Sequence, residues 1–186
     1  MITVTKSYLP DISQYNEYIR QVWERGHLTN HGPLVFELEE KVRSYLGVKH
    51  CFLVNNGTIA LQIALKALEV KGEVITTPFS YVATTSSIVW EGLKPVFADI
   101  ESNTCCINPK EIESKISPDT KTILATHVYG LACAVEEIED IAQKNDLNII
   151  YDAAHAFGVK YKGTSIVNYG DISTFSFHAT KIFHTI

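Results

Sequence analysis

The sequence has little that would suit nucleic acid, a membrane or an oxidising compartment. It has no run of lysine or arginine, and the net charge of its 186 residues is −5, which argues against a nucleic-acid surface. No apolar run approaches membrane-spanning length, and the N-terminus does not read as a signal peptide. The four cysteines show no C-x-x-C spacing, so neither a zinc site nor a disulfide framework is indicated. We therefore expect a cytoplasmic protein with reduced thiols that acts on small molecules, with neither nucleic acid nor membrane as a partner.

Several ligand-binding motifs are missing as well. No glycines stand in G-x-G-x-x-G order, so a Rossmann dinucleotide site is not indicated. Gly158 and Gly163 have the spacing of a P-loop, but Thr164 stands where the lysine is required, and we interpret the segment as a β-turn. There is no H-E-x-x-H, and His178 and His184 have no third ligand nearby in the sequence, so we predict no metal.

The sequence does contain an alternation of apolar strands and amphipathic helices, and 46 % of its residues are hydrophobic. Two helices come first, from Asp11 or Ser13 to about Glu24 and from about Leu34 to Leu46. Strands are then expected at residues 49–55, 73–77, 94–100, 122–128, 147–152 and 172–177, helices at 59–70, 80–90, 109–116 and 135–144, and a hairpin at 157–165. This order predicts an α/β fold whose mostly parallel sheet carries helices on both faces. We divide the chain into an N-terminal helical arm, residues 1–32, and a large domain, residues 33–186.

Four polar clusters fall at expected strand ends, at residues 55–58, 76–81, 152–155 and 176–181. Open α/β sheets bind their ligands beyond the carboxyl ends of the strands. The joint placement of these clusters predicts one small-molecule site at that edge of the sheet.

Two of the clusters suit a phosphate. Gly57 permits close approach of a ligand, and the backbone N–H groups of Gly57, Thr58 and Ile59 at a helix N-terminus form a seat for an anion. Asn-Gly also begins many hairpins, but a helix follows here rather than a strand. The Ser176 hydroxyl could reach a phosphate or merely cap the next turn.

Two other clusters suit a flat heteroaromatic ring. Asp152 could keep a ring nitrogen protonated, and His155 could contact a ring oxygen or stack, although a helix N-cap aspartate with a satisfied histidine explains both residues equally well. Tyr81, near Phe79, could lie over the ring or pack in the core.

Lys181 stands alone shortly after the last expected strand. An amine there could form a Schiff base with an aldehyde cofactor, provided that its surroundings suit the neutral form. The alternative is an ordinary solvated lysine, which is what most lysines are.

The blocks NNGTIALQIALKAL, GEVITTPFSYVATT, GLKPVFADI, YDAAHAFG and SFHATK, in this order, closely resemble the DegT/DnrJ/EryC1/StrS family of sugar aminotransferases. The resemblance covers nearly the whole chain, including LTNHGPLVFELEEKV near the start. It implies the large domain of a fold-type I enzyme, with a sheet of the seven-stranded type and pyridoxal 5′-phosphate (PLP) as cofactor.

The resemblance also implies roles for single residues. Lys181 would carry the cofactor and then move the proton, and Asp152 would pair with the pyridinium nitrogen. His155 would contact the ring hydroxyl and Tyr81 would stack on the ring. The phosphate would be held by Gly57, Thr58 and Ser176.

The implied reaction runs in two halves, in which glutamate converts PLP to pyridoxamine phosphate and this form aminates a keto group on a nucleotide-linked deoxysugar. The segments YDAAHAFG and SFHATKIFHT most resemble the corresponding sequences of enzymes that aminate dTDP-keto-6-deoxyhexoses for surface polysaccharides. Relatives act as homodimers and continue into a smaller C-terminal domain, which this chain is expected to lack. Two alternatives stay open: an inert or merely PLP-binding chain, and a PLP-dependent sugar dehydratase, in which histidine replaces the lysine.

Overall fold

The computed structural model describes residues 6–185, and these fall into two units. One unit comprises the chain up to Leu53 together with the residues from His178 onward, and the other is Val54–Phe177. The division into an arm and a large domain at residue 32 stays a prediction.

The first unit begins with two helices that the sequence predicted. α1 spans Ile12–Arg25 and starts at Asp11, whose carboxylate accepts a backbone N–H of the first turn at 2.8 Å. It ends at Gly26, which has a φ of 64°, a left-handed conformation that glycine adopts without cost. α2 spans Pro33–Leu46 and ends in the same way at Gly47, with a φ of 66°. Both predicted helices are therefore confirmed.

The C-terminal tail of the first unit is bonded to the N-terminal segment. The hydroxyl of Ser7 donates to the carbonyl of Ala179 at 2.6 Å, and Nε2 of His184 lies 2.6 Å from the carbonyl oxygen of Tyr8. These bonds join residues that are more than 170 positions apart in the chain.

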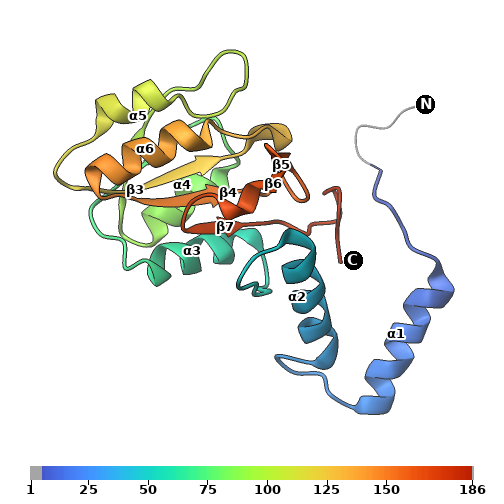
Figure 1. The fold of residues 1–186 in the computed structure, drawn as a ribbon. Coiled ribbons are helices and arrows are strands. Elements are labelled where there is room, and N and C mark those ends of the chain that lie inside the picture. Colours follow the sequence, from blue (N-terminus) through green and yellow to red (C-terminus); the bar gives the residue numbers. More distant parts are fainter. Residues whose placement is uncertain (1–5, 186) are drawn as a thin grey trace. The chain divides into compact units, whose positions relative to one another are not determined.

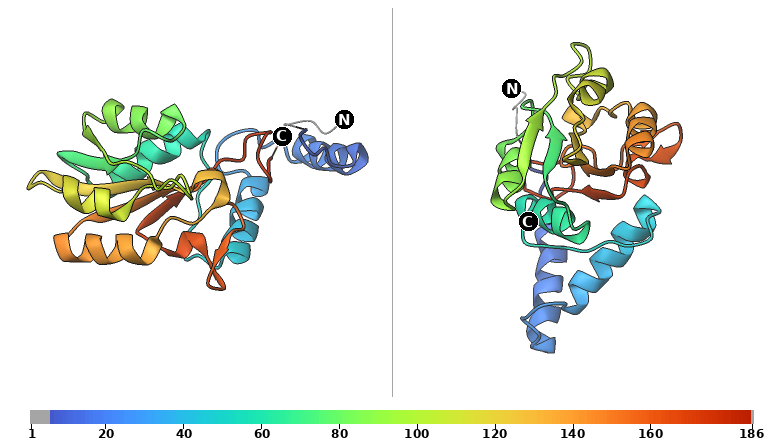
Figure 2. Two further views of the ribbon diagram at one scale, coloured as in Figure 1. Left: turned by 90° about the horizontal axis from the view of Figure 1, so that it is seen from above. Right: turned by 90° about the vertical axis from the view of Figure 1, so that its left-hand side faces the viewer.

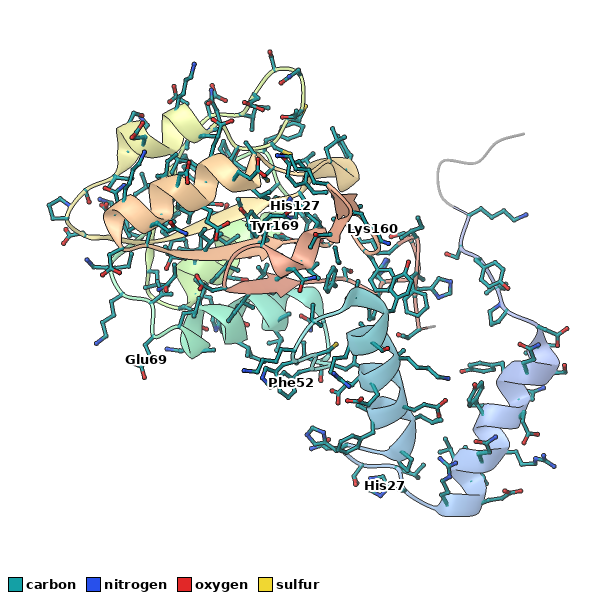
Figure 3. The ribbon with its side chains drawn as sticks, in the orientation of Figure 1. His27, Phe52, Glu69, His127, Lys160 and Tyr169 are labelled. Atoms are coloured by element: carbon teal, nitrogen blue, oxygen red, sulfur yellow. The ribbon has the colours of Figure 1, made fainter. Side chains whose placement is uncertain are left out.

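The strand expected at residues 49–55 is wrong. Residues 51–54 form no strand, and the backbone N–H of Leu53 donates instead to a side-chain oxygen of Glu39 on α2, at 2.8 Å. Phe52 is 76 % exposed and is labelled in Figure 3. An apolar run can form a strand only where another strand pairs with it, and here a carboxylate takes the backbone donor.

The second unit is built on a parallel sheet, shown in Figure 1. Its strands stand in the order β2-β1-β3-β4-β7, and all neighbours are parallel. Their bounds are Glu73–Thr76 (β1), Lys94–Phe97 (β2), Thr120–Thr126 (β3), Asn148–Asp152 (β4) and Ile172–Thr174 (β7). The α/β class is confirmed, but the described residues place five strands in this sheet rather than seven. The predicted hairpin is present as β5, Lys160–Tyr161, paired antiparallel with β6, Thr164–Ser165.

Helices cover both faces of the sheet, as the two views of Figure 2 show. They are α3 (Gly57–Ala67), α4 (Val82–Trp90), α5 (Pro109–Lys115) and α6 (Val135–Asn145), with short 3₁₀ helices at Val128–Gly130 and Ile166–Asn168. All four helices lie where the sequence predicted them, with ends shifted by up to three residues. No helix in residues 6–185 has both the length and the apolarity that crossing a membrane requires.

Alternate residues of the strands pack against the two helical layers. In β4, Ile149 and Tyr151 belong to the larger core cluster, which also contains Ile138 of α6. Ile150 points the other way and packs in a smaller cluster with Leu65 of α3. Burial on both faces explains the three consecutive apolar residues of β4, Ile149, Ile150 and Tyr151.

Candidate functional site

The carboxyl ends of three strands meet in register at one edge of the sheet. Asp152 ends β4 and pairs with Thr126 at the end of β3 and with Thr174 at the end of β7. Its position in the middle of this edge leaves Asp152 only 5 % exposed. A carboxylate so placed is costly to bury unless donors surround it.

Donors hold both carboxylate oxygens of Asp152. The hydroxyl of Thr84, in the first turn of α4, donates to Oδ2 at 2.8 Å, and the backbone N–H of Ala154 donates to Oδ1 at 3.1 Å. Thr84 is fully buried and was not singled out in the sequence, because its partner lies 68 residues further along. The two bonds leave each oxygen with a further lone pair for a ligand.

Tyr81 stands immediately before α4 and is 73 % exposed. Its carbonyl oxygen accepts the backbone N–H of Thr84 at 3.1 Å, so the turn that carries Tyr81 is tied to the residue that bonds Asp152. The exposed ring is not part of the core, which removes the alternative that Tyr81 is simply a packing residue.

His155 belongs to a row of aromatic rings. It stacks on Tyr129 with ring centroids 6.0 Å apart and planes 5° apart, and the ring of Phe79 is nearly perpendicular to that of Tyr129, with centroids 6.5 Å apart. Nδ1 of His155 accepts the backbone N–H of Tyr129 at 3.3 Å, so a neutral imidazole carries its proton on Nε2. Tyr129 has a φ of 53°, a conformation uncommon for a side chain of this size, and its ring is 75 % exposed.

The residues expected to hold a phosphate are neighbours. A Cβ built on Gly57 would lie 4.0 Å from Cβ of Ser176 and 3.7 Å from the carbonyl oxygen of Phe175, so the start of α3 lies against the segment after β7. The prediction that the N–H of Ile59 is free for a phosphate is wrong, because it already donates to the Asn56 side chain at 3.0 Å. The anion seat therefore reduces to the amides of Gly57 and Thr58, with Ser176 beside them.

Lys181 belongs to the first unit, whereas Asp152 belongs to the second. It lies in a turn in which its backbone N–H donates to the carbonyl of His178 at 2.8 Å. The side chain of His178 bonds Thr180 at 2.9 Å within the same turn. The strand before it ends at Thr174, earlier than predicted.

His127 follows the end of β3 and contacts Asp152, although nothing in the sequence marks it as a site residue. Its backbone N–H donates to the carbonyl of Asp152 at 3.0 Å, and its ring stacks on Tyr151 at 4.5 Å. Nδ1 accepts the backbone N–H of Cys133 at 3.1 Å, while Nε2 finds no hydrogen-bond partner within residues 6–185. Burial lowers the pKa of His127, which is labelled in Figure 3, from 6.5 to about 4.

This buried imidazole should make the protein lose stability in mild acid. Between pH 6.5 and 4 the unfolded chain binds a proton at His127 that the folded chain does not bind. The free energy of unfolding therefore falls as the pH falls through this window, by up to about 3 kcal/mol. Urea unfolding at several pH values would measure it. The slope should flatten in His127→Asn, whose amide oxygen can replace Nδ1 as acceptor, and should persist in the exposed control His50→Asn. Equal slopes in all three proteins would contradict this role of His127.

The model of the DegT/DnrJ/EryC1/StrS aminotransferase family matches residues 11–186. The chain belongs to this family. Members of the family are PLP-dependent aminotransferases, and the resemblance drawn from the five sequence blocks is confirmed.

Relatives of known name carry the comparison further. The dTDP-4-amino-4,6-dideoxy-D-glucose transaminase of Shigella dysenteriae is 50 % identical over 184 residues, which are 99 % of this chain and 50 % of that protein. The GDP-perosamine synthase of Vibrio cholerae is 35 % identical over 89 % of this chain and 46 % of its own length. The crystal structure of DesI with its TDP-sugar product matches with a TM-score of 0.93 and 34 % identity, covering 97 % of this chain and 46 % of that one. The chain thus spans about half the length of the proteins that it matches.

Proposed function

We propose that the protein transfers an amino group to a keto group of a nucleotide-linked deoxysugar, with PLP as cofactor. The observation that carries the proposal is the Asp152 carboxylate, which is buried at the carboxyl edge of the sheet with one donor on each oxygen. Such a group suits a protonated heteroaromatic nitrogen, because this nitrogen supplies the positively charged partner that a buried carboxylate needs.

The residues around Asp152 fit the rest of the cofactor. When bound, PLP supplies an aldehyde and an electron-withdrawing ring, which acidifies the proton to be moved. His155, which stacks on Tyr129, is proposed to contact a ring oxygen. Tyr81 offers an exposed ring for stacking, and Gly57 with Ser176 offers a seat for the phosphate.

Lys181 is proposed as the group that attaches the cofactor and afterwards moves the proton. Its amine is the nucleophile that an aldehyde requires, and a lysine in this role also serves as general base. The presence of lysine, rather than histidine, also favours amino transfer over sugar dehydration.

The substrate class follows from the relatives. A dTDP-linked keto-6-deoxyhexose is the proposed acceptor, because the Shigella relative, named as a transaminase of a dTDP-linked sugar, is 50 % identical over 99 % of this chain. Glutamate as donor and a homodimeric assembly complete the proposal. Exposed apolar side chains on α3 and α4 support association, namely Ile59, Ile63, Val82, Val89 and Trp90.

The proposal is tested with the purified protein, PLP, glutamate and a dTDP-linked 4-keto-6-deoxyhexose, with the GDP-linked sugar as control. Mass spectrometry should detect the amino sugar from the dTDP substrate. Cofactor binding without any amino sugar would favour the alternative of a PLP-binding chain without turnover, and absence of cofactor binding would overturn both. Sedimentation of the same sample tests the assembly, and a single monomeric species at micromolar concentration would contradict the homodimer.

A further inference from the structure

The buried hydroxyl of Thr84 has a use beyond joining α4 to the sheet. It is the side-chain donor that reaches Asp152, at 2.8 Å, and the second donor is the backbone of Ala154 on the opposite oxygen. Two donors on two different oxygens fix the rotation of the carboxyl group about its Cβ–Cγ bond. The lone pairs that remain then point in fixed directions, which is the condition for binding a ring N–H without rearrangement.

The backbone of the same residue holds the Tyr81 turn. The N–H of Thr84 donates to the carbonyl of Tyr81 at 3.1 Å, in the turn that starts α4. One buried residue therefore fixes both the carboxylate that would meet the ring nitrogen and the turn that carries the stacking ring.

We propose that Thr84 is a positioning residue of the cofactor site, orienting Asp152 through its hydroxyl and the Tyr81 turn through its amide. The assignment rests on the proposed function, since it names what holds the ring-binding groups in place. Thr84 itself need not touch the cofactor.

Thr84→Val is the sharpest variant. Valine keeps the branched shape and the backbone N–H, and replaces only the hydroxyl by a methyl group, so Oδ2 of Asp152 loses its donor inside the protein. Thr84→Ser keeps the hydroxyl and should rescue the effect. Thr85→Val is the matched control, because it makes the same change at the next position of α4, on the half-buried Thr85.

The measurement is the affinity of each purified protein for PLP and for pyridoxamine phosphate, by titration of the visible and near-ultraviolet bands. Thr84→Val should bind about tenfold more weakly, while Thr84→Ser and Thr85→Val bind as the wild type does. With ¹⁵N-labelled cofactor, the ring nitrogen of bound PLP should show the protonated chemical shift in the wild type and a shift towards the unprotonated value in Thr84→Val. A purely structural contact would not move this signal.

Each other outcome counts against the assignment. Equal affinity and equal nitrogen shift in Thr84→Val and wild type would overturn it and leave the proposed function intact. Failure of the wild type to bind would overturn the proposed function and the assignment with it. If Thr84→Val does not fold, Thr84→Ala takes its place against Thr84→Ser, and equal affinities in that pair would overturn the assignment.

Discussion

Replacing Lys181 with alanine is expected to slow amino transfer strongly and to abolish the adduct with PLP that borohydride traps. The lysine has two roles in the proposed reaction, as the nucleophile for the cofactor's aldehyde and as the base that moves a proton. General acid–base catalysis alone contributes about 10²–10⁴-fold, so the rate should fall roughly a thousandfold or more. The measurement is the rate of amino-sugar formation, together with mass spectrometry of the borohydride-treated protein.

The local structure suggests that this variant folds. Lys181 contributes its backbone N–H to the turn with His178, and alanine retains that bond. Lys160→Ala is the control, since Lys160 is an exposed lysine of the β5–β6 hairpin, labelled in Figure 3. If borohydride still trapped a PLP adduct in Lys181→Ala, another amine would attach the cofactor, and the role proposed for Lys181 would be wrong.

Short-range patterns predicted most of the fold. The apolar spacing of α1 and the glycine after it specify that helix with no reference to the rest of the chain. The apolar segments at residues 123–125 and 149–151, each preceded by a helix, mark the buried strands β3 and β4 in the sequence. The failure at residues 49–55 has a clear cause, because a strand depends on a partner that lies elsewhere in the sequence.

The site was predicted only in part, for the same physical reason. Asp152 and Gly57 stand at the ends of elements and Ser176 follows shortly after β7, so a strand or helix boundary marks each of them in the sequence. Thr84 and His127 carry no such mark, since their importance arises from a hydrogen bond or burial created by residues far along the chain. The capped amide of Ile59 likewise depends on how the Asn56 side chain turns.

Asp152→Asn should bring the second large loss of activity. Asparagine has nearly the same shape but no charge, so the ring nitrogen would no longer be held protonated. Its NH₂ group would also face one of the two donors, Thr84 Oγ1 or Ala154 N–H, each of which now donates to a carboxylate oxygen. Removing one preorganised electrostatic group from an active site costs about 10²–10³ in kcat, and we expect a loss of this size. Steady-state kinetics should show it mainly in kcat.

A matched control and a double variant decide whether this loss belongs to the site. Asp146→Asn makes the same change at an exposed residue with a φ of 53°, a conformation that asparagine tolerates, and should leave kcat unchanged. If Thr84 acts through the carboxylate, adding Thr84→Val to Asp152→Asn should cost little beyond the single Asp152→Asn change, because coupled residues are not additive. Full additivity of the two losses would mean that Thr84 and Asp152 act independently, whereas an unchanged kcat in Asp152→Asn would remove the carboxylate from the mechanism.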